Sequence, residues 1–305
     1  MDKICELADR IDDLAMMIYN DYHEQGIKIN FLEALNKTLD YMNGQDDLMI
    51  NLKEAKKLYQ EITKIDLSLD EARRALFLEE IKAYRHINFN MSSITPDVMA
   101  LILIHLMNIK SKSTILELGI GTGNLSSTIF TNLDKDLHFI GVEQNQDLCE
   151  LVKNKANFLK MPMEIHMEDN LSFNYPNVDY IIADIDSYEY ENEYYDSELY
   201  KKGVRNYSYL LMEKHLSSGK EDADAFYIVD TSFFSHNDSK LFKEFFDKYA
   251  YFKYIITLPS SFFVKETKMI LIVSKRLDDK KHTTNIINLP NDNWQQILLN
   301  IRMEK

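Results

Sequence analysis

Residues 114–125 read TILELGIGTGNL, and this stretch decides the fold. An aliphatic run comes first, a turn with Gly119, Gly121 and Gly123 follows, and a helical pattern begins after it. Glycine lets the backbone of such a turn approach a ligand closely, and the helix that follows offers unpaired N–H groups at its start. The stretch therefore predicts a strand, a ligand-binding turn and a helix.

The spacing of the glycines argues against two common kinds of nucleotide-binding loop. Glu117 stands before the first glycine, so the pattern is E-x-G-x-G-x-G and differs from the G-x-G-x-x-G of dinucleotide-binding proteins. The turn also lacks the Gly-Lys-Ser/Thr ending of a phosphate-binding loop. A carboxylate at Glu117 suits an ammonium group.

Three further acidic residues follow predicted strands. Glu143 lies about 20 residues beyond the glycine turn, where an acid accepts hydrogen bonds from both hydroxyls of a ribose. Asp169 follows the third strand, at a place suited to an adenine amino group, and Asp184 follows the fourth. Because ligands of open α/β sheets bind at the carboxyl ends of the strands, we expect these acids to share one edge.

Short β-like runs alternate with helical stretches after residue 87, which indicates an α/β fold with a mostly parallel sheet covered by helices. Only residues 258–267 separate the last two strands, too few for a helical crossover, so we expect an antiparallel hairpin at one end of the sheet. The seven predicted strands are residues 114–118, 137–142, 163–167, 178–183, 225–229, 251–257 and 268–273.

Helical periodicity alone marks the first part of the chain, which predicts four amphipathic helices and an all-α domain. Ser68 followed by Glu71 forms a plausible capping box for the fourth helix. We expect a helical domain at residues 1–86, an α/β domain at residues 87–276, and a tail with a short helix at residues 277–305.

Composition limits the class of protein. The 305 residues include 35 Lys plus Arg and 49 Asp plus Glu, a net charge of −14, which argues against general attraction to nucleic acid or anionic membranes. The longest apolar run, residues 98–107, is about half of the ~20 residues that span a bilayer. Cys5 and Cys149 make no disulfide framework, and the histidines show no metal-ligand spacing. These features predict a soluble cytoplasmic protein with no metal and no membrane partner.

The order and spacing of residues 117–123, Glu143, Asp169 and Asp184 resemble the motifs of class I S-adenosylmethionine-dependent methyltransferases. The resemblance covers residues 87–276 and implies a seven-stranded Rossmann-like sheet with a terminal hairpin. It implies S-adenosylmethionine as cofactor, with the methionine at Glu117 and the glycines, the ribose at Glu143 and the adenine at Asp169. The full set of predicted cofactor-binding residues is Thr95, Pro96, Glu117, Gly119, Gly121, Gly123, Asn124, Glu143, Gln144, Asp169, Asn170 and Asp184.

A narrower resemblance concerns the acceptor. The helical domain, residues 91–97 (MSSITPD) and residues 258–263 (LPSSFF) resemble N6-adenine DNA methyltransferases, namely the modification subunits of type I restriction systems and stand-alone relatives in Gram-positive bacteria. It implies DNA adenine as the acceptor, with Thr95 and Pro96 beside the methionine end of the cofactor. In that family Asn/Asp-Pro-Pro-Tyr/Phe follows the fourth strand: the acid or amide accepts the hydrogens of the adenine amine, and the aromatic ring stacks on the flipped base.

This chain departs from that signature. Residues 183–190 read ADIDSYEY, so isoleucine and aspartate replace both prolines and serine stands at the aromatic position. We expect Asp184 to orient the acceptor, and Tyr188 or Tyr190 to stack on it if the loop is rearranged. Asp184 and Tyr188 are therefore the predicted catalytic residues.

The segment after the signature is acidic. Seven acids between Asp184 and Glu198 precede the first base, Lys201, with tyrosines interleaved, so a polyanion would be repelled here. The segment also fits a solvated lid whose tyrosines pack on the domain. Besides a DNA adenine enzyme, two hypotheses stay open: a methyltransferase-derived binding protein without catalysis, and a methyltransferase for a small molecule, RNA or protein. The leading helices have three candidate roles: covering the cleft, recognising substrate, or forming a homodimer.

Overall fold

The computed structural model describes residues 3–44, 52–87, 94–174, 176–194, 196–216, 220–221, 223–263, 267–278, 280 and 282–301. The chain forms two compact units, which are described separately. The first consists of Met1–Asp97, Gly121–Asp134 and Asn145–Met167, and the second of Val98–Ile120, Lys135–Gln144 and Glu168–Lys305. The domain boundaries predicted after residues 86 and 276 stay predictions.

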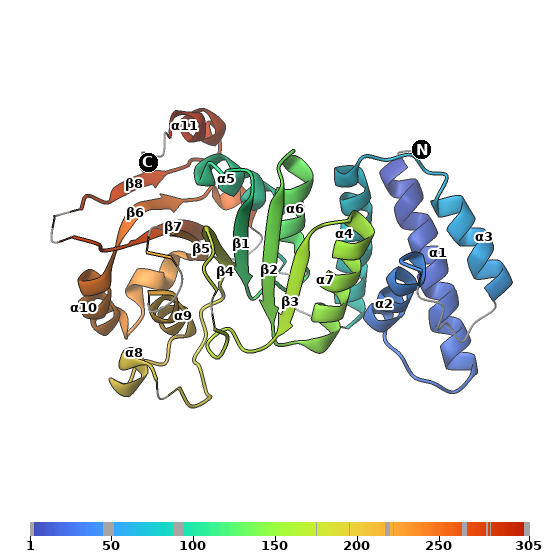
Figure 1. Cartoon of the computed structure of the whole chain (residues 1–305), viewed down its shortest axis with the longest axis horizontal. Coiled ribbons are helices and arrows are strands. Elements are labelled where there is room, and N and C mark those ends of the chain that lie inside the picture. Colours follow the sequence, from blue (N-terminus) through green and yellow to red (C-terminus); the bar gives the residue numbers. More distant parts are fainter. Residues whose placement is uncertain are drawn as a thin grey trace. The chain divides into compact units, whose positions relative to one another are not determined.

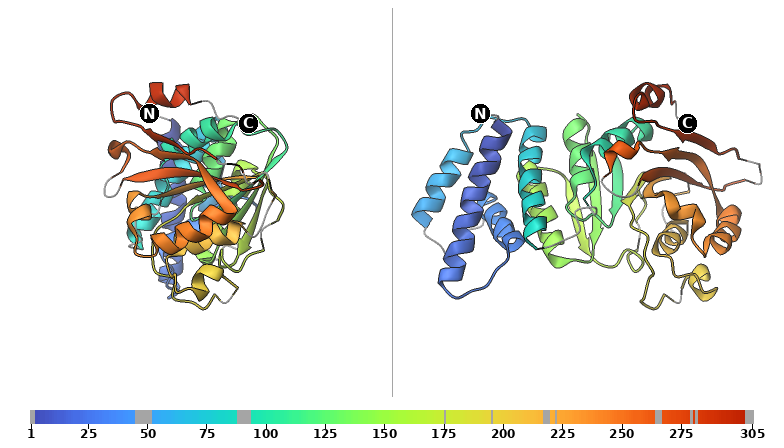
Figure 2. Two further views of the ribbon diagram at one scale, coloured as in Figure 1. Left: turned by 90° about the vertical axis from the view of Figure 1, so that its left-hand side faces the viewer. Right: turned by 180° about the vertical axis from the view of Figure 1, so that it is seen from behind.

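The first unit is built from helices that share one apolar core. Its elements are α1 (Lys3–Glu24), α2 (Phe31–Met42), α3 (Leu52–Ile62), α4 (Leu69–His86), α6 (Asn124–Asn132), α7 (Gln146–Leu159) and the strand β3 (Met163–Met167). Figure 2 shows α1 to α4 in blue and cyan. The four predicted N-terminal helices are confirmed, and so is the capping box, because the Ser68 side chain accepts from the Glu71 N–H while the Glu71 carboxylate accepts from the Ser68 N–H.

Burial of one helix stripe explains why these segments fold together. Leu7, Ile11, Leu14 and Ile18 recur at helical spacing and are buried on α1, which packs against α2, α3 and α4. A hydrogen bond joins α2 to α7: the Asn36 side chain donates to the Asp147 backbone carbonyl at 3.0 Å. The unit therefore combines the N-terminal helices with two helices from later in the chain.

The second unit is a sheet with helices on both faces. Within it the strand order is β2-β1-β4-β5-β7-β6-β8 (Figure 1). β1 pairs in parallel with β2 and β4, and β4 in parallel with β5, whereas β7 runs antiparallel to both β5 and β6. The strands are β1 (Ser113–Leu118), β2 (Leu137–Glu143), β4 (Tyr180–Asp184), β5 (Asp224–Asp230), β6 (Ala250–Thr257), β7 (Lys268–Lys275) and β8 (Asn285–Asn288).

The number and place of the strands correct the sequence prediction in one respect. The described residues contain eight strands instead of seven, because β8 pairs in parallel with β6. The predicted antiparallel pairing of the last two apolar strands is confirmed, but that hairpin is not at the end of the sheet. β8 has only two apolar residues, Ile286 and Ile287, and Ile286 is 77% exposed. The sequence therefore lacks the apolar run or alternation that would have predicted this strand.

Helices cover both faces of this sheet. α8 (Glu198–Lys201), α9 (Tyr207–Leu216) and α10 (Ser239–Tyr249) lie on one face, and α5 (Asp97–Met107) and α11 (Trp294–Asn300) on the other (Figures 1 and 2). The first group buries an aromatic cluster in which the Tyr209 and Phe242 rings stack with centroids 4.2 Å apart. β7 is buried along almost its whole length, as its continuous apolar run requires.

A buried histidine joins α9 to the sheet. His215 is 1% exposed, and its Nδ1 lies 2.6 Å from the Tyr227 hydroxyl on β5. Burial lowers the pKa of His215 to about 3, with a smaller contribution from the charge of Lys275. The ring is therefore neutral in the folded protein at physiological pH.

This histidine predicts a loss of stability in mild acid. Unfolded His215 takes up a proton below pH ~6.5 but the folded ring does not, so the stability that it contributes is present above pH ~6.5 and falls by about 1.4 kcal/mol per pH unit below it. In urea unfolding between pH 7.5 and 5, we expect the wild type to lose its advantage over His215→Gln as the pH falls. Tyr227→Phe should keep the wild-type pH dependence, because burial is the main cause. A pH-independent difference between wild type and His215→Gln would contradict this account.

Candidate functional site

The predicted site residues are divided between the two units. The second unit contains Glu117, Gly119, Glu143, Gln144, Asp169, Asn170, Asp184 and Tyr188. The first unit contains Thr95, Pro96, Gly121, Gly123 and Asn124. Residues 91–93 of the quoted MSSITPD motif lie outside the described residues.

Three acids of the second unit meet at the carboxyl edge of its parallel strands. Glu117 is the penultimate residue of β1 and is 3% exposed, while Glu143 ends β2 and Asp184 ends β4. Since β2, β1 and β4 are neighbours and run in the same direction, the strands bring these side chains to one edge, as the sequence predicted.

The turn after β1 depends on a left-handed glycine. Gly119 has φ +63°, a backbone conformation that residues with a side chain rarely adopt. A Cβ atom at this position would lie 3.6 Å from Asn170 Nδ2. The Gly119 N–H donates to Asn170 Oδ1 at 3.0 Å, and Asn170 Nδ2 donates to the Tyr207 hydroxyl at 2.8 Å. Asn170 therefore connects the glycine turn to the start of α9.

Asp169 already has two partners within the protein. Its Oδ1 accepts from the Leu171 N–H at 2.8 Å, and its Oδ2 accepts from the Tyr190 hydroxyl at 2.9 Å. Burial, together with the Asp169 carboxylate, raises the pKa of Tyr190 to about 12, so the phenol keeps the proton that it donates. Each carboxylate oxygen can accept a second hydrogen bond, which leaves capacity for a ligand amino group.

Two tyrosines form an aromatic step beside these acids. The Tyr188 and Tyr207 rings stack with centroids 4.5 Å apart and an interplanar angle of 17°, and the Tyr207 N–H donates to the Tyr188 carbonyl at 2.9 Å. Burial raises the pKa of Tyr188 to about 12, and the charges of Asp169 and Glu143 add to this shift. Tyr188 is 46% exposed whereas Tyr190 is 6% exposed, so Tyr188 is the one that presents surface to a ligand.

The predicted acceptor-orienting acid is paired with a lysine that the sequence did not reveal. Lys268 Nζ lies 2.6 Å from Asp184 Oδ1 and 3.5 Å from Asp186 Oδ1, and the Lys268 and Asp184 side chains are only 9% and 11% exposed. Burial alone would lower the pKa of Lys268, but the charges of Asp184, Asp186 and Asp230 outweigh it and raise the pKa. The only sequence signal was a charged residue opening an otherwise apolar strand.

The residues in place of the two prolines continue the sheet. The Ile185 N–H donates to the Ile228 carbonyl at 2.9 Å, a bond that proline lacks the hydrogen to make. Ile185 is 3% exposed, and Ser187 Oγ accepts from Asn206 Nδ2 at 2.8 Å. The backbone beyond Asp184 therefore takes a path specific to these residues.

The acidic segment is anchored at several points. Glu189 and Asn206 form an antiparallel β-bridge, and the Tyr190 N–H donates to the Arg205 carbonyl at 2.8 Å. The buried Glu213 carboxylate accepts from the Ser197 hydroxyl and from the Glu198 N–H at the start of α8. Tyr190 is buried and Tyr194 and Tyr200 are partly buried, whereas the acids exposed to solvent are Asp186, Glu189, Glu191, Glu193 and Asp196. The surface of the segment is strongly negative.

In the first unit, the start of α6 is fixed by a buried arginine. Arg73 on α4 is 1% exposed and forms a double hydrogen bond with Asp97, at 2.8 and 3.1 Å, and a third with Asn124 Oδ1 at 3.0 Å. Asn124 Nδ2 donates to the Thr95 carbonyl at 2.8 Å. Arg73 was not among the predicted site residues, and its signal in the sequence was an arginine on the apolar side of an amphipathic helix.

The hydrogen bonds of Arg73 and Asn124 join the segment with Thr95 and Asp97 to the start of α6. Burial would raise the pKa of Asp97, but the hydrogen bonds and charge of Arg73 outweigh it and keep the pKa below its usual range. The glycines that precede α6 are left-handed, and a Cβ at Gly123 (φ +68°) would lie 3.0 Å from Val152 Cγ1. The roles of Thr95, Pro96, Gly121, Gly123 and Asn124 toward a cofactor stay predictions.

The described residues show neither of two other features, a membrane-spanning helix or a cluster of metal ligands. In that part of the chain, no helix is both long and apolar enough to pass through a bilayer. The same residues contain no cluster of three or more His, Cys, Asp or Glu side chains suited to hold a metal ion.

Three parallel strands carry Glu117, Glu143 and Asp184 at their carboxyl ends; together with the left-handed glycine turn and the antiparallel β7 they define a class I S-adenosylmethionine-dependent methyltransferase fold. A family model described as protein-L-isoaspartate(D-aspartate) O-methyltransferase (PCMT) matches residues 43–201, just over half of the chain. The chain belongs to this family. Family and fold together imply S-adenosylmethionine as the cofactor.

Known proteins resemble the chain over most of its length. The uncharacterized protein YtxK of Bacillus subtilis (strain 168) is 26% identical over 276 residues, 85% of this chain and 82% of that protein. The structure of a Listeria monocytogenes protein described as a class I S-adenosylmethionine-dependent methyltransferase aligns with a TM-score of 0.83 at 24% identity and covers 97% of both chains.

A second solved structure matches the narrower resemblance. The methyltransferase subunit of a type I restriction-modification system from Streptococcus thermophilus aligns with a TM-score of 0.63 at 15% identity, over 97% of this chain and 72% of that one. At these identities the two structures establish a shared fold. The predicted resemblance to class I methyltransferases is confirmed.

The arginine network predicts a large effect of one substitution. Arg73→Ala removes the buried guanidinium that donates to the Asp97 carboxylate and to Asn124 Oδ1, so we expect the free energy of unfolding to fall by about 3 kcal/mol. Arg74→Ala, at the adjacent exposed position, should cost less than about 0.5 kcal/mol. Urea unfolding of both variants checks the expectation, and equal losses would contradict the structural role of Arg73.

Proposed function

We propose that the chain transfers a methyl group from S-adenosylmethionine to a nitrogen acceptor held beside Asp184. The observation that carries the proposal is the placement of Glu117, Glu143 and Asp184 at the ends of three neighbouring parallel strands, with the left-handed Gly119 in the turn after the first. The proposed enzyme needs no covalent intermediate, because a positioned nucleophile can take the methyl group directly.

The residues of the second unit fit this cofactor chemically. Glu143 suits the two ribose hydroxyls, Asp169 keeps accepting capacity for the adenine amino group, and the buried Glu117 suits the methionine ammonium. Gly119 leaves room that a Cβ would fill next to Asn170. The cofactor supplies a methyl group on a positively charged sulfur, so the protein has to bind, align and exclude water.

The charge around Asp184 favours a particular acceptor. Among the described residues, the Lys268 ammonium interacts with the carboxylates of Asp184, Asp186 and Asp230, and the exposed acids that follow Asp184 add further negative charge. An uncharged or cationic nitrogen compound is attracted to such a site, and its N–H groups have a carboxylate to donate to. The ion pair with Lys268 holds the Asp184 side chain in place for that contact.

The same charge argues against an anionic acceptor. The family is named for O-methylation of isoaspartate and D-aspartate in proteins, and such a carboxylate would meet the exposed acids of residues 186–196. Membership in the family therefore supports the cofactor and the reaction type, while the acceptor that we propose differs from the one in its name.

Adenine N6 in DNA is the second candidate acceptor. Asp184 stands at the position of the acid or amide in the signature of N6-adenine DNA methyltransferases, and the half-exposed Tyr188 ring offers a stacking surface. A protein of the restriction-modification type shares the fold. The acidic segment opposes this candidate, because the phosphates of DNA require positive partners.

Cofactor binding is the first test. By titration calorimetry we expect wild-type protein to bind S-adenosylmethionine, and Glu143→Ala to weaken binding at least ~10-fold, because a charged hydrogen-bond partner is lost. Glu168→Ala is the matched control: this exposed glutamate meets Glu143 only through its backbone N–H, and affinity should change less than ~2-fold. Absence of binding by the wild type would refute the cofactor assignment.

The acceptor is tested by methyl transfer. We expect label from tritiated S-adenosylmethionine to enter uncharged or cationic amines, and Asp184→Asn to lower kcat/KM by ~100-fold through lost positioning. Asp186→Asn, at an exposed acid, should stay within ~3-fold of wild type. Loss of N6-methyladenine from the genome of a strain without the gene would instead establish DNA as the acceptor. Cofactor binding with no transfer to amines, DNA, RNA or peptides would favour a binding protein without catalysis.

A further inference from the structure

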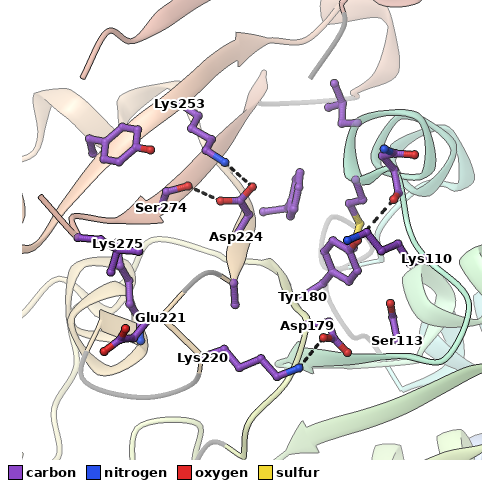
Figure 3. A pocket seen from close by; sticks show the side chains of 17 residues that line it. Lys110, Ser113, Asp179, Tyr180, Lys220, Glu221, Asp224, Lys253, Ser274 and Lys275 are labelled. Atoms are coloured by element: carbon purple, nitrogen blue, oxygen red, sulfur yellow. Dashed lines mark hydrogen bonds and ion pairs between the residues drawn. The ribbon is translucent and has the colours of Figure 1, made fainter. Parts of the chain in front are cut away.

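A pocket lies at the edge of the sheet opposite to the acids of the candidate site (Figure 3). Ser113, Tyr180 and Asp224 line it, and they are the first residues of the parallel strands β1, β4 and β5. Its volume is about 450 Å³, which is in the range of small-molecule sites. All of its lining residues belong to the second unit.

Lysines from four different parts of the unit converge on this pocket. Lys110 comes from the turn after α5, Lys220 from the segment before β5, Lys253 from β6 and Lys275 from the end of β7 (Figure 3). Three acids also line it, so the described lining carries more positive than negative groups in a chain whose net charge is −14. The pocket is therefore a local exception to the charge of the protein.

The aspartates hold the lysines without using up their donors. Asp179 Oδ1 lies 2.5 Å from Lys220 Nζ, and its Oδ2 accepts a backbone N–H at 2.9 Å. Asp224 Oδ2 lies 2.8 Å from Lys253 Nζ, and its Oδ1 accepts a serine hydroxyl. An ammonium has three N–H donors, and each of these contacts uses one of them.

The remaining walls are apolar and aromatic. Phe226, Tyr251, Leu106 and Leu277 line the pocket together with the Tyr180 ring. Such walls suit the body of an organic molecule, while the lysines suit its charge. The described lining contains lysine but no arginine, and lysine binds a phosphate as a compact point charge.

We infer that this pocket binds a small organic phosphate of mononucleotide size, with the phosphate among the lysines and the organic part against the aromatic wall. The site is separate from the proposed methyl-transfer site and does not depend on it, because the two lie at opposite ends of the parallel strands.

The test is calorimetry on the full chain with uridine 5′-monophosphate, uridine and inorganic phosphate as probes. We expect the monophosphate to bind, and uridine and inorganic phosphate each to bind at least ~10-fold more weakly, because each lacks half of the contacts. Lys110→Glu should weaken monophosphate binding at least ~10-fold. Lys112→Glu is the matched control, because it makes the same charge change at an exposed lysine two residues away that does not line the pocket. It should change the affinity for the monophosphate less than ~2-fold.

The inference would be overturned by any of four results: no binding of the monophosphate to the wild type, equal binding of uridine, equal loss in Lys110→Glu and Lys112→Glu, or tighter binding of a single-stranded oligonucleotide than of the monophosphate. Glu143→Ala should bind the monophosphate like the wild type, and a loss there would place the probe at the cofactor site instead. Both lysines are exposed, so unchanged thermal unfolding of the two variants is expected and confirms that they are folded.

Discussion

The hydrogen bond from the Gly119 N–H to the Asn170 side chain is the contact on which the candidate site depends. Through its own amide, Asn170 reaches the hydroxyl of Tyr207, whose ring supports Tyr188. Three segments far apart in the sequence are thus held in one arrangement: the turn after β1, the residues that follow β3 and the start of α9. A site that aligns two reactants needs such rigidity, because small displacements of a positioned group cost much of the rate.

Buried charge has a different task in each unit. Arg73 satisfies an acid and an amide and thereby fixes the chain ahead of α6, whereas Lys268 faces more carboxylates than it can neutralise. Removing charges from water is costly, so each pair persists only with good geometry and several partners. In the second unit, Asp184 and the exposed acids after it make one end of the strands negative, and at the other end lies a pocket lined by more lysines than acids.

Much of the fold could be predicted because its signals are local. Apolar runs marked β1 to β7, helical periodicity marked α1 to α4, and the pairing of Ser68 with Glu71 was evident from their spacing. The long-range pairs could not be predicted: Lys268 and Asp184 are 84 residues apart, and Arg73 and Asp97 are 24 apart. Spacing along a chain does not report which charges meet after folding. β8 was missed because backbone pairing, not burial of side chains, holds it to β6.

The Ile185 N–H that donates to Ile228 also bears on how such a chain changes over generations. A mutation that introduced proline at position 185 would remove this bond at once, before a second mutation at position 186 could complete a Pro-Pro turn. The buried isoleucine side chain would be lost in the same step. The single substitution Ile185→Pro would therefore lower the stability of the fold, which favours retention of isoleucine at this position.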